Sequence, residues 1–220
     1  MEISYQFTMA DGRRQHFAVD LLRGNQPRSG GALPSWTRLD YHQCSNCPLK
    51  TSDTPHCPAA ADLAPAIGAF SKVISYERAM VTVQTPERTI SKECQVQVAL
   101  SSLAALIMAT SGCPILGRMR GLALMHLPFA TMEETLFRSV GAYLIKQLLT
   151  YKQGGQPDWE LGGLKAHYGD LEVLNRAFRE RIITAAVQDA TLNAVAQLGM
   201  LSVGVGMLID DQLSDLARFG

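Results

Sequence analysis

Five cysteines carry the most specific chemistry in the sequence, and two of them, Cys44 and Cys47, form a C-x2-C pair. Cys57 follows nearby in an HCP motif, and Cys113 stands far downstream in an SGCP motif. A C-x2-C pair places two sulfurs on one tight turn, the spacing that chelates Zn²⁺ or an iron–sulfur cluster once further ligands arrive from elsewhere in the fold. The sequence therefore predicts a metal site with Cys44, Cys47, Cys57 and Cys113 as its ligands.

Three of these cysteines, Cys47, Cys57 and Cys113, are followed directly by proline. Proline is favoured at the first position of a helix, because its missing N–H would be unbonded there in any case. Each of the three thiols could therefore occupy a helix N-cap, where the helix dipole and unpaired N–H groups lower the thiol pKa. That position favours the thiolate, the form that binds metals or attacks electrophiles.

Zinc is the first expected cofactor, because four thiolates suit a closed tetrahedral site. An iron–sulfur cluster is the alternative, since Cys-Pro is familiar at iron–sulfur ligands. A third alternative has no metal, and Cys44 and Cys47 then cycle between dithiol and disulfide. His42 and His56 flank the cysteines and are possible substitutes for Cys113 as a ligand.

The remaining candidates are weaker. Cys94 has no partner at ligand spacing and is expected to be incidental. His126 could face a pocket together with Glu133, Glu134 and Arg138, but acid–base work requires hydrogen-bond contact, which the sequence cannot show. The common nucleotide-binding and hydrolase motifs do not occur in the sequence.

Composition narrows the class of protein. The 220 residues contain 20 Lys and Arg and 20 Asp and Glu, so the formal net charge is zero and predicts no nucleic-acid or acidic-membrane partner. The first residues lack the features of a secretory signal, and the apolar passages 99–108 and 198–209 are too short to span a bilayer. We expect a cytoplasmic protein, where five cysteines indicate metal or redox chemistry and not disulfides.

The first half of the chain reads as short antiparallel strands. Residues 1–22 alternate polar and apolar side chains around a turn signal and predict a β-hairpin. Residues 23–35, rich in Gly, Pro and Ser, predict a flexible connector. Residues 36–41 are expected to form a third strand that leads into the Cys-rich loop, within the segment 36–58.

Mixed and then helical structure is expected over 59–220. A helix over 59–70 is followed by a second hairpin, from strands over 73–84 and 88–90. Ser91 is expected to cap a helix over 92–110 with a broad apolar face.

The second half is expected to be mainly helical. Thr131 and Glu134 fit a capping box ahead of a helix that ends at 154–157. Further helices are predicted over 164–186, with Arg176, Arg179, Glu180 and Arg181 on its wetter side, then over 189–200, and in a short element over 212–219. Strands first and helices later predict a single α+β domain with the Cys-rich loop at the junction.

The chain resembles an uncharacterised family of bacterial proteins. The resemblance rests on the CxxCP motif at Cys44 to Pro48, the HCP motif ending at Pro58, the SGCP motif at Cys113 and the stretch His126 to Phe129. It extends over nearly the whole chain. It implies a bacterial, cytoplasmic protein and no particular activity.

The function that these residues favour is a non-enzymatic, metal-binding role, structural or in protein interaction. The expected partner is another protein or a second copy of the chain, because the apolar C-terminal helices could pair as a homodimer. An iron–sulfur or thiol sensor is the second hypothesis, and an enzyme with a pocket near His126 is the third.

Overall fold

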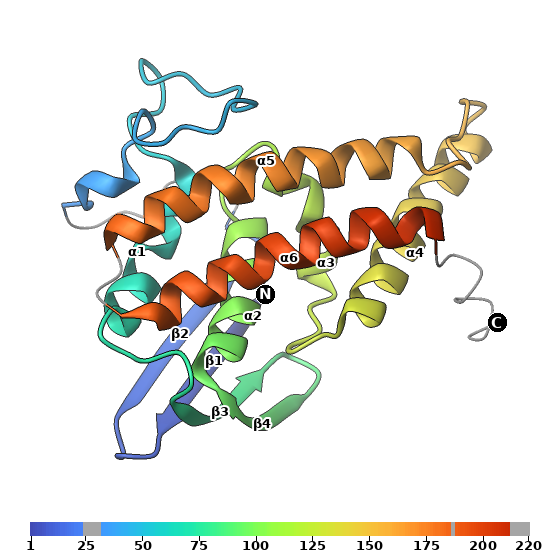
Figure 1. Ribbon diagram of the computed structural model, residues 1–220. Helices are drawn as coiled ribbons and strands as arrows, with labels where there is room; N and C mark the ends of the chain where they lie inside the picture. Colours follow the sequence, from blue (N-terminus) through green and yellow to red (C-terminus); the bar gives the residue numbers. More distant parts are fainter. Residues whose placement is uncertain (24–31, 186–187, 212–220) are drawn as a thin grey trace.

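The computed structural model describes residues 1–23, 32–185 and 188–211, and its architecture is α+β, as the sequence predicts (Figure 1). Four strands, β1 (Glu2–Met9), β2 (Arg14–Asp20), β3 (Arg78–Gln84) and β4 (Thr89–Gln95), form one antiparallel sheet. Their order is β2-β1-β3-β4. Both predicted hairpins are therefore confirmed, and the pairing of β1 with β3 joins them.

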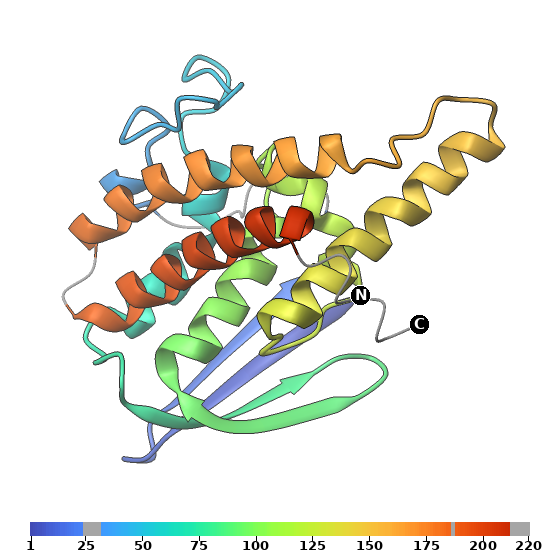
Figure 2. The ribbon, with the colours of Figure 1, turned by 45° about the vertical axis from the view of Figure 1, so that its right-hand side comes forward.

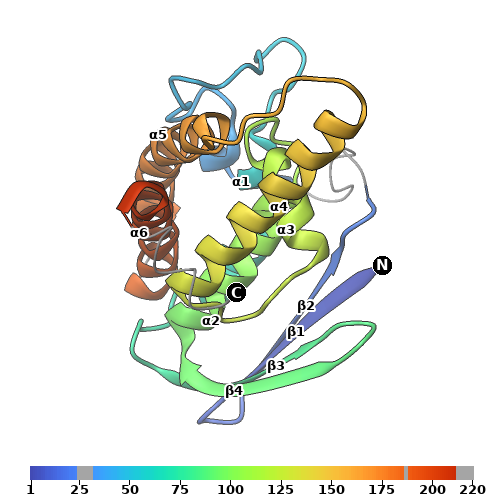
Figure 3. The ribbon, with the colours of Figure 1, turned by 90° about the vertical axis from the view of Figure 1, so that its right-hand side faces the viewer.

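One face of the sheet carries the core. Ile3, Tyr5 and Phe7 on β1 are buried, because alternate side chains of a strand point to the same face. Figure 3 shows the helices stacked on this side of the sheet only. The nearest are α1 (Pro58–Phe70) and α2 (Val96–Ala109).

Aromatic and polar contacts fix these helices on the sheet. Phe70 of α1 lies 4.8 Å from Phe7, measured between ring centroids. The Tyr5 hydroxyl forms a hydrogen bond of 2.8 Å with Ser102 of α2. The position of α2 matters because the segment that follows it contains Cys113.

A second layer of helices covers α2. α5 (Gly162–Ala185) and α6 (Asp189–Asp211) run side by side, while the far end of α4 (Met132–Lys152) reaches away from them (Figures 1 and 2). Three short elements complete the described part: η1 (Ser35–Thr37), η2 (Leu116–Met119) and α3 (Arg120–Leu124).

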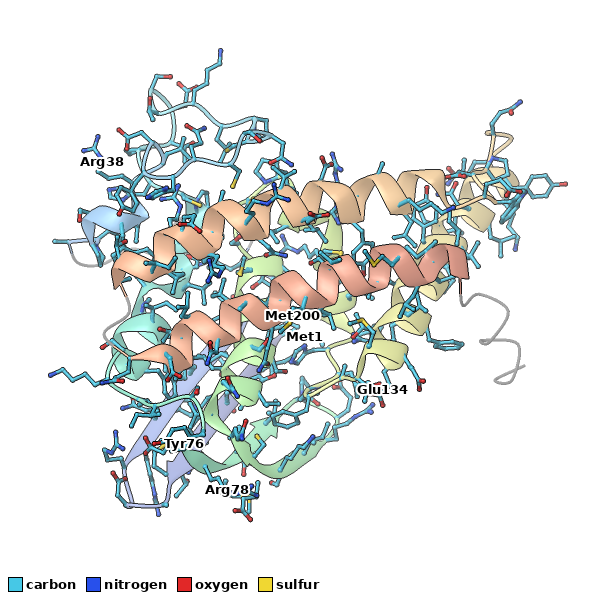
Figure 4. All side chains as sticks on the ribbon, viewed as in Figure 1. Met1, Arg38, Tyr76, Arg78, Glu134 and Met200 are labelled. Atoms are coloured by element: carbon cyan, nitrogen blue, oxygen red, sulfur yellow. The ribbon has the colours of Figure 1, made fainter. Side chains whose placement is uncertain are left out.

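The capping box at the start of α4 is confirmed. The Thr131 hydroxyl accepts a hydrogen bond from the Glu134 N–H, and the Glu134 carboxylate accepts one of 2.8 Å from the Thr131 N–H. Figure 4 shows Glu134 at this end of α4. The sequence alone was sufficient here because all the groups lie within four residues.

Two boundary predictions are wrong. Residues 36–41 do not form a strand: η1 occupies 35–37, and Arg38 makes a single isolated bridge with His56. The helix expected over 92–110 begins only at Val96, since β4 pairs along its whole length with β3 and includes Cys94. In both cases the pairing of the backbone with a neighbouring segment determines the local structure.

The last described helix is longer than predicted. α6 continues to Asp211. Its 21-residue stretch Asp189–Ile209 contains a window with a mean hydropathy of 1.7 and is long and apolar enough to cross a membrane by length and composition alone. The same stretch packs against α2, α4 and α5. Residues 24–31 of the predicted connector and the short element predicted over 212–219 lie outside the described residues.

Candidate functional site

The cysteine loop, residues 38–57, lies against α5 and is drawn at the top of Figure 1. Two backbone hydrogen bonds join the two ends of the loop, which form its neck. The Leu39 N–H donates to the Pro55 carbonyl at 2.9 Å, and the Cys57 N–H donates to the Thr37 carbonyl at 2.8 Å. Within the loop, Cys47 N–H donates to the Cys44 carbonyl at 3.0 Å. That bond forms the tight turn expected of the C-x2-C pair.

The predicted N-cap position is confirmed for Cys57, but the lowered thiol pKa expected there is wrong. Cys57 is the N-cap of α1, and Pro58 occupies the first turn. Burial raises the pKa of the Cys57 thiol, while the N–H groups of Ala60 and Ala59 oppose that rise. The thiol therefore faces the start of the helix.

Cys113 has a similar environment at a shorter turn. Its carbonyl accepts a hydrogen bond of 2.9 Å from the Gly117 N–H. Burial raises the pKa of the Cys113 thiol, and the N–H groups of Leu116 and Ile115 oppose that rise. The N-cap prediction is nevertheless wrong for Cys113, because the N-cap of η2 is Ile115. It is also wrong for Cys47, because no helix follows Pro48.

The four predicted ligands share one neighbourhood. Burial raises the pKa of the Cys44 thiol to about 12, and repulsion from Cys57, Cys47 and Cys113 adds to the increase. Cys57 and Cys47 also raise the pKa of Cys113. Because charge repulsion falls off with distance, three segments that are remote in sequence bring their sulfurs into electrostatic range of one another.

Among residues 1–23, 32–185 and 188–211, no group of three or more His, Cys, Asp or Glu side chains is arranged to hold a metal ion. All five cysteines are free thiols. Cys94 lies on β4.

The two flanking histidines differ in their contacts. His56 Nδ1 forms a hydrogen bond of 2.8 Å with the Thr37 hydroxyl. His42 is exposed, with a backbone φ of 45°, and packs edge-on against Tyr41. Neither contact involves a cysteine.

Arg181 lies beside this cluster and is 1% exposed, so its predicted place on the wetter side of α5 is wrong. Its guanidinium donates to the carbonyls of Trp36 at 2.8 Å, Arg38 at 2.5 Å and Leu39 at 3.0 Å. Its Nε is buried without a partner among the described residues. The positive charge of Arg181 lowers the pKa of both Cys44 and Cys57.

Asp170 of α5 joins two of the cysteine-bearing segments. Its carboxylate accepts a hydrogen bond of 3.3 Å from the Asn46 amide, which lies inside the C-x2-C turn. The same carboxylate accepts one of 2.9 Å from Arg118 in η2, five positions after Cys113. Asp170 therefore holds the C-x2-C turn and η2 against one point of α5.

His167 lies one turn before Asp170 and is 6% exposed. Neither ring nitrogen has a hydrogen-bond partner in the described part of the chain, and the same holds for the side-chain oxygen of Asn46. Burial and the charge of Arg118 lower the pKa of His167 to about 4, although Asp170 opposes them. His167 is therefore a neutral imidazole near neutral pH.

His126 belongs to a separate cavity between the helices. Its Nε2 lies 2.5 Å from the Tyr5 hydroxyl. Burial, with a smaller effect from the charge of Arg138, lowers the pKa of His126 to about 4. Glu134 is engaged in its capping box, and the described hydrogen bonds of His126 include no carboxylate, so a possible acid–base pair of His126 with Glu134 is not formed.

These features define an α+β protein in which one buried and three partly buried thiols lie within electrostatic range of one another. Residues 3–219 match a family described as a domain of unknown function, DUF6901, and the chain belongs to that family. This confirms the resemblance to an uncharacterised family. The comparisons with curated proteins and with solved structures found no match.

The sequence did not single out several residues of the site. Arg181, Asp170 and His167 all lie on the side of α5 that faces the cysteine loop, and the spacing of seven residues from His167 to Leu174 to Arg181 is the helical signal for this. Asp170 lies three residues after His167 and four before Leu174, which places it on the same helix face. The partners of Asp170 and Arg181 in and beside the cysteine loop lie more than a hundred positions away and leave no local pattern.

Proposed function

We propose that Cys44, Cys47, Cys57 and Cys113 bind one metal ion, with zinc as the first expectation, and that the ion has a structural role. The observation that carries this proposal is that Cys57, Cys47 and Cys113 raise the pKa of Cys44, and that Cys57 and Cys47 raise that of Cys113. Four cysteines matching the ligand number and chemistry of a closed zinc site are thus near one another although they come from three segments.

The charges around the thiols support the proposal. Four thiolates around Zn²⁺ carry a net charge of about −2, which is costly to bury without compensation. Arg181 supplies a buried positive charge with an unbonded Nε, and the N–H groups of Ala59, Ala60, Ile115 and Leu116 face two of the thiols. The surroundings are those that an anionic metal–thiolate group requires.

Burial also supports binding over free reactivity. The raised pKa values of Cys44, Cys57 and Cys113 mean that these thiols stay protonated near neutral pH and are weak nucleophiles. A metal ion displaces those protons, and its binding free energy then contributes directly to folding. A thiol sensor would need at least one thiol with a lowered pKa.

Binding requires the sulfurs to approach one another, since no group is arranged to hold an ion among the described side chains. The C-x2-C turn is the segment suited to that movement. Residues between the neck of the loop and Asn46 contact α5 through few bonds, such as that of the Tyr41 hydroxyl to Thr184 at 3.0 Å. The ion would therefore draw the turn onto the starts of α1 and η2.

The proposed role is non-enzymatic. A bound ion would fix the cysteine loop on the helices and hold its surface in one shape for a protein partner or a second copy of the chain. The iron–sulfur cluster stays as the second candidate for the same four ligands, because Cys-Pro sequences suit it equally.

The experiment is metal analysis of the full chain, purified without oxygen and without chelators. We expect about one zinc ion per chain, and Cys44→Ser or Cys57→Ser should reduce it below about a tenth of that value. Cys94→Ser is the matched control and should leave the metal content unchanged. Chelation should lower Tm by about 10 °C.

Two other results would favour the alternatives to zinc. If the purified chain absorbs visible light and contains iron and sulfide but no zinc, the four cysteines hold an iron–sulfur cluster. A chain free of metal, whose Tm is the same in wild type and in Cys57→Ser with and without added zinc, would overturn the proposal for every metal.

A further inference from the structure

A cavity of about 260 Å³ lies between α2, α4, α5, α6 and the segment 116–130. It is separate from the cysteine loop. Most of its walls are aliphatic, with Leu106 and Val98 of α2, Leu122 of α3 and Leu198 of α6 among them. A cavity of this size and lining resembles the sites that proteins use for small ligands.

Three ionisable side chains line the cavity: His126, Arg138 and Tyr168. Tyr168 is neutral and bonds Ser139 at 2.7 Å, while His126 is occupied by Tyr5. Burial lowers the pKa of His126 to about 4, so its imidazole is neutral as well. Arg138 is thus the lining side chain with a full charge, and no carboxylate lines the cavity among the described residues.

Arg138 has donors to spare. Its Nη2 donates to the carbonyls of Leu122 at 2.9 Å and Met125 at 2.6 Å. In the described part of the chain, its Nε and Nη1 have no hydrogen-bond partner, and Glu134 on the same helix attracts the guanidinium without forming an ion pair with it. The two carbonyls fix the guanidinium, and the remaining N–H groups match the fork that binds a carboxylate with two parallel hydrogen bonds.

Backbone strain marks the same cavity. Phe129, which lines it, has a φ of 60°, a conformation that an aromatic residue adopts only at a cost. Its N–H donates to the Ser102 hydroxyl at 3.1 Å, and this bond belongs to the chain that runs through Tyr5 to His126. Strain held in place by several hydrogen bonds is frequent at ligand sites.

From these observations we propose that the cavity binds an aliphatic carboxylic acid. The hydrocarbon chain lies among the apolar walls, and the carboxylate pairs with Arg138. One guanidinium balances the single charge of a carboxylate, whereas a phosphate dianion would leave a charge uncompensated in a half-buried position. Leu127 and Arg138 are both partly exposed, which gives the ligand a route of entry.

The volume sets the length of the ligand. An apolar cavity of roughly 150 Å³ holds one benzene, so this cavity has room for about ten non-hydrogen atoms. Octanoate, with that number of atoms, is therefore the probe. It tests the cavity independently of the metal site, whose ligands do not line it.

Calorimetric titration of the full chain with octanoate, 1-octanol and octylammonium is the first test. We expect saturable binding of one octanoate, at least about tenfold tighter than either comparison ligand. Arg138→Met should weaken octanoate binding at least about tenfold, and Lys152→Met at the far end of α4 should not change it. Equal binding of all three ligands, or equal binding to Arg138→Met and wild type, would overturn the proposal.

A second test needs no variant. Met108 and Met119 line the cavity, while Met80 lies on β3 and is 47% exposed. In methyl NMR of the unmodified chain, octanoate should shift the signals of Met108 and Met119 and leave that of Met80 in place. Shifts at Met80 alone, or none at saturating octanoate, would show that the cavity is not the binding site.

Discussion

Arg181 donates a hydrogen bond of 2.5 Å to the backbone carbonyl of Arg38, although the two residues are 143 positions apart. A side chain that is 1% exposed thereby fastens the start of the cysteine loop to α5. A buried guanidinium bonded to three carbonyls is expensive to remove, because the carbonyls are then left without donors.

Arg181→Met should accordingly lower the free energy of unfolding by about 2–4 kcal/mol, measured by urea denaturation. Arg179→Met is the matched control on the same helix, where the side chain is 49% exposed, and should change stability by less than about 0.5 kcal/mol. Equal effects of the two substitutions would show that the carbonyl contacts do not stabilise the loop.

Burial of the thiols predicts slow alkylation. Cys44, Cys57 and Cys113 have raised pKa values, with that of Cys44 at about 12, so little thiolate is present near neutral pH. Iodoacetamide should modify these residues at least about tenfold more slowly in the folded chain than in urea, as measured by peptide mass spectrometry. Labelling of Cys44 at the same rate in both states would contradict its protonated, buried environment.

His167 predicts a loss of stability in acid. Its pKa is 6.5 when unperturbed and about 4 in the fold, so between these values the unfolded chain binds a proton that the folded chain does not. This contribution is fully present above pH 6.5, decreases as the pH falls, and stops changing below about pH 4. His126 acts in the same direction.

His167→Leu tests that assignment. The substitution removes two buried ring nitrogens that have no partner among the described residues, so stability at neutral pH should stay the same or rise. The decrease in Tm between pH 6.5 and 4 should become smaller than in wild type. An unchanged pH profile would mean that the pKa of His167 is not lowered in the fold.

Asp170 predicts a positioning effect on the metal site. Asp170→Asn weakens the bonds to Asn46 and Arg118 and leaves every thiol in place, so zinc affinity should fall about tenfold in competition with a chromophoric chelator. Asp53→Asn is the control and should leave the zinc affinity unchanged. Asp53 lies in the same loop, and among the described side chains its carboxylate accepts a hydrogen bond only from the neighbouring Ser52. Equal affinities would remove Asp170 from the proposed site.

The capping box gives a local check. Thr131→Ala should destabilise the chain by about 1 kcal/mol, whereas Thr131→Ser keeps the hydroxyl and most of the stability. Thermal unfolding of both variants distinguishes a loss of the cap from a general intolerance of the position.

Local patterns were sufficient to predict part of this fold. The hairpins that contribute β1 to β4 and the start of α4 depend on residues close in sequence, and the structure has them as expected. The stretch 36–41 failed because Arg181, from far downstream, takes the carbonyls that a neighbouring strand would need. A prediction from local composition cannot anticipate that a distant arginine bonds these backbone carbonyls.

The candidate site was predicted in its residues but not in its surroundings. The C-x2-C spacing and the proline after Cys57 are local, and both led to the observed turn and N-cap. The compensating charge of Arg181 was invisible, because a helical run of charged residues ordinarily faces water. Burial of one member of such a run depends on tertiary contacts alone.

α5 is the single helix that separates the cysteine loop from the cavity near Arg138. Arg181 and Asp170 face the cysteine loop, while Tyr168, Leu171 and Asn175 form part of the wall of the cavity. A small tilt of the helix axis would enlarge the space on one side and compress the other. A substitution in α5 that changes the shape of the cavity is therefore expected to disturb the cysteine loop, and the reverse also holds.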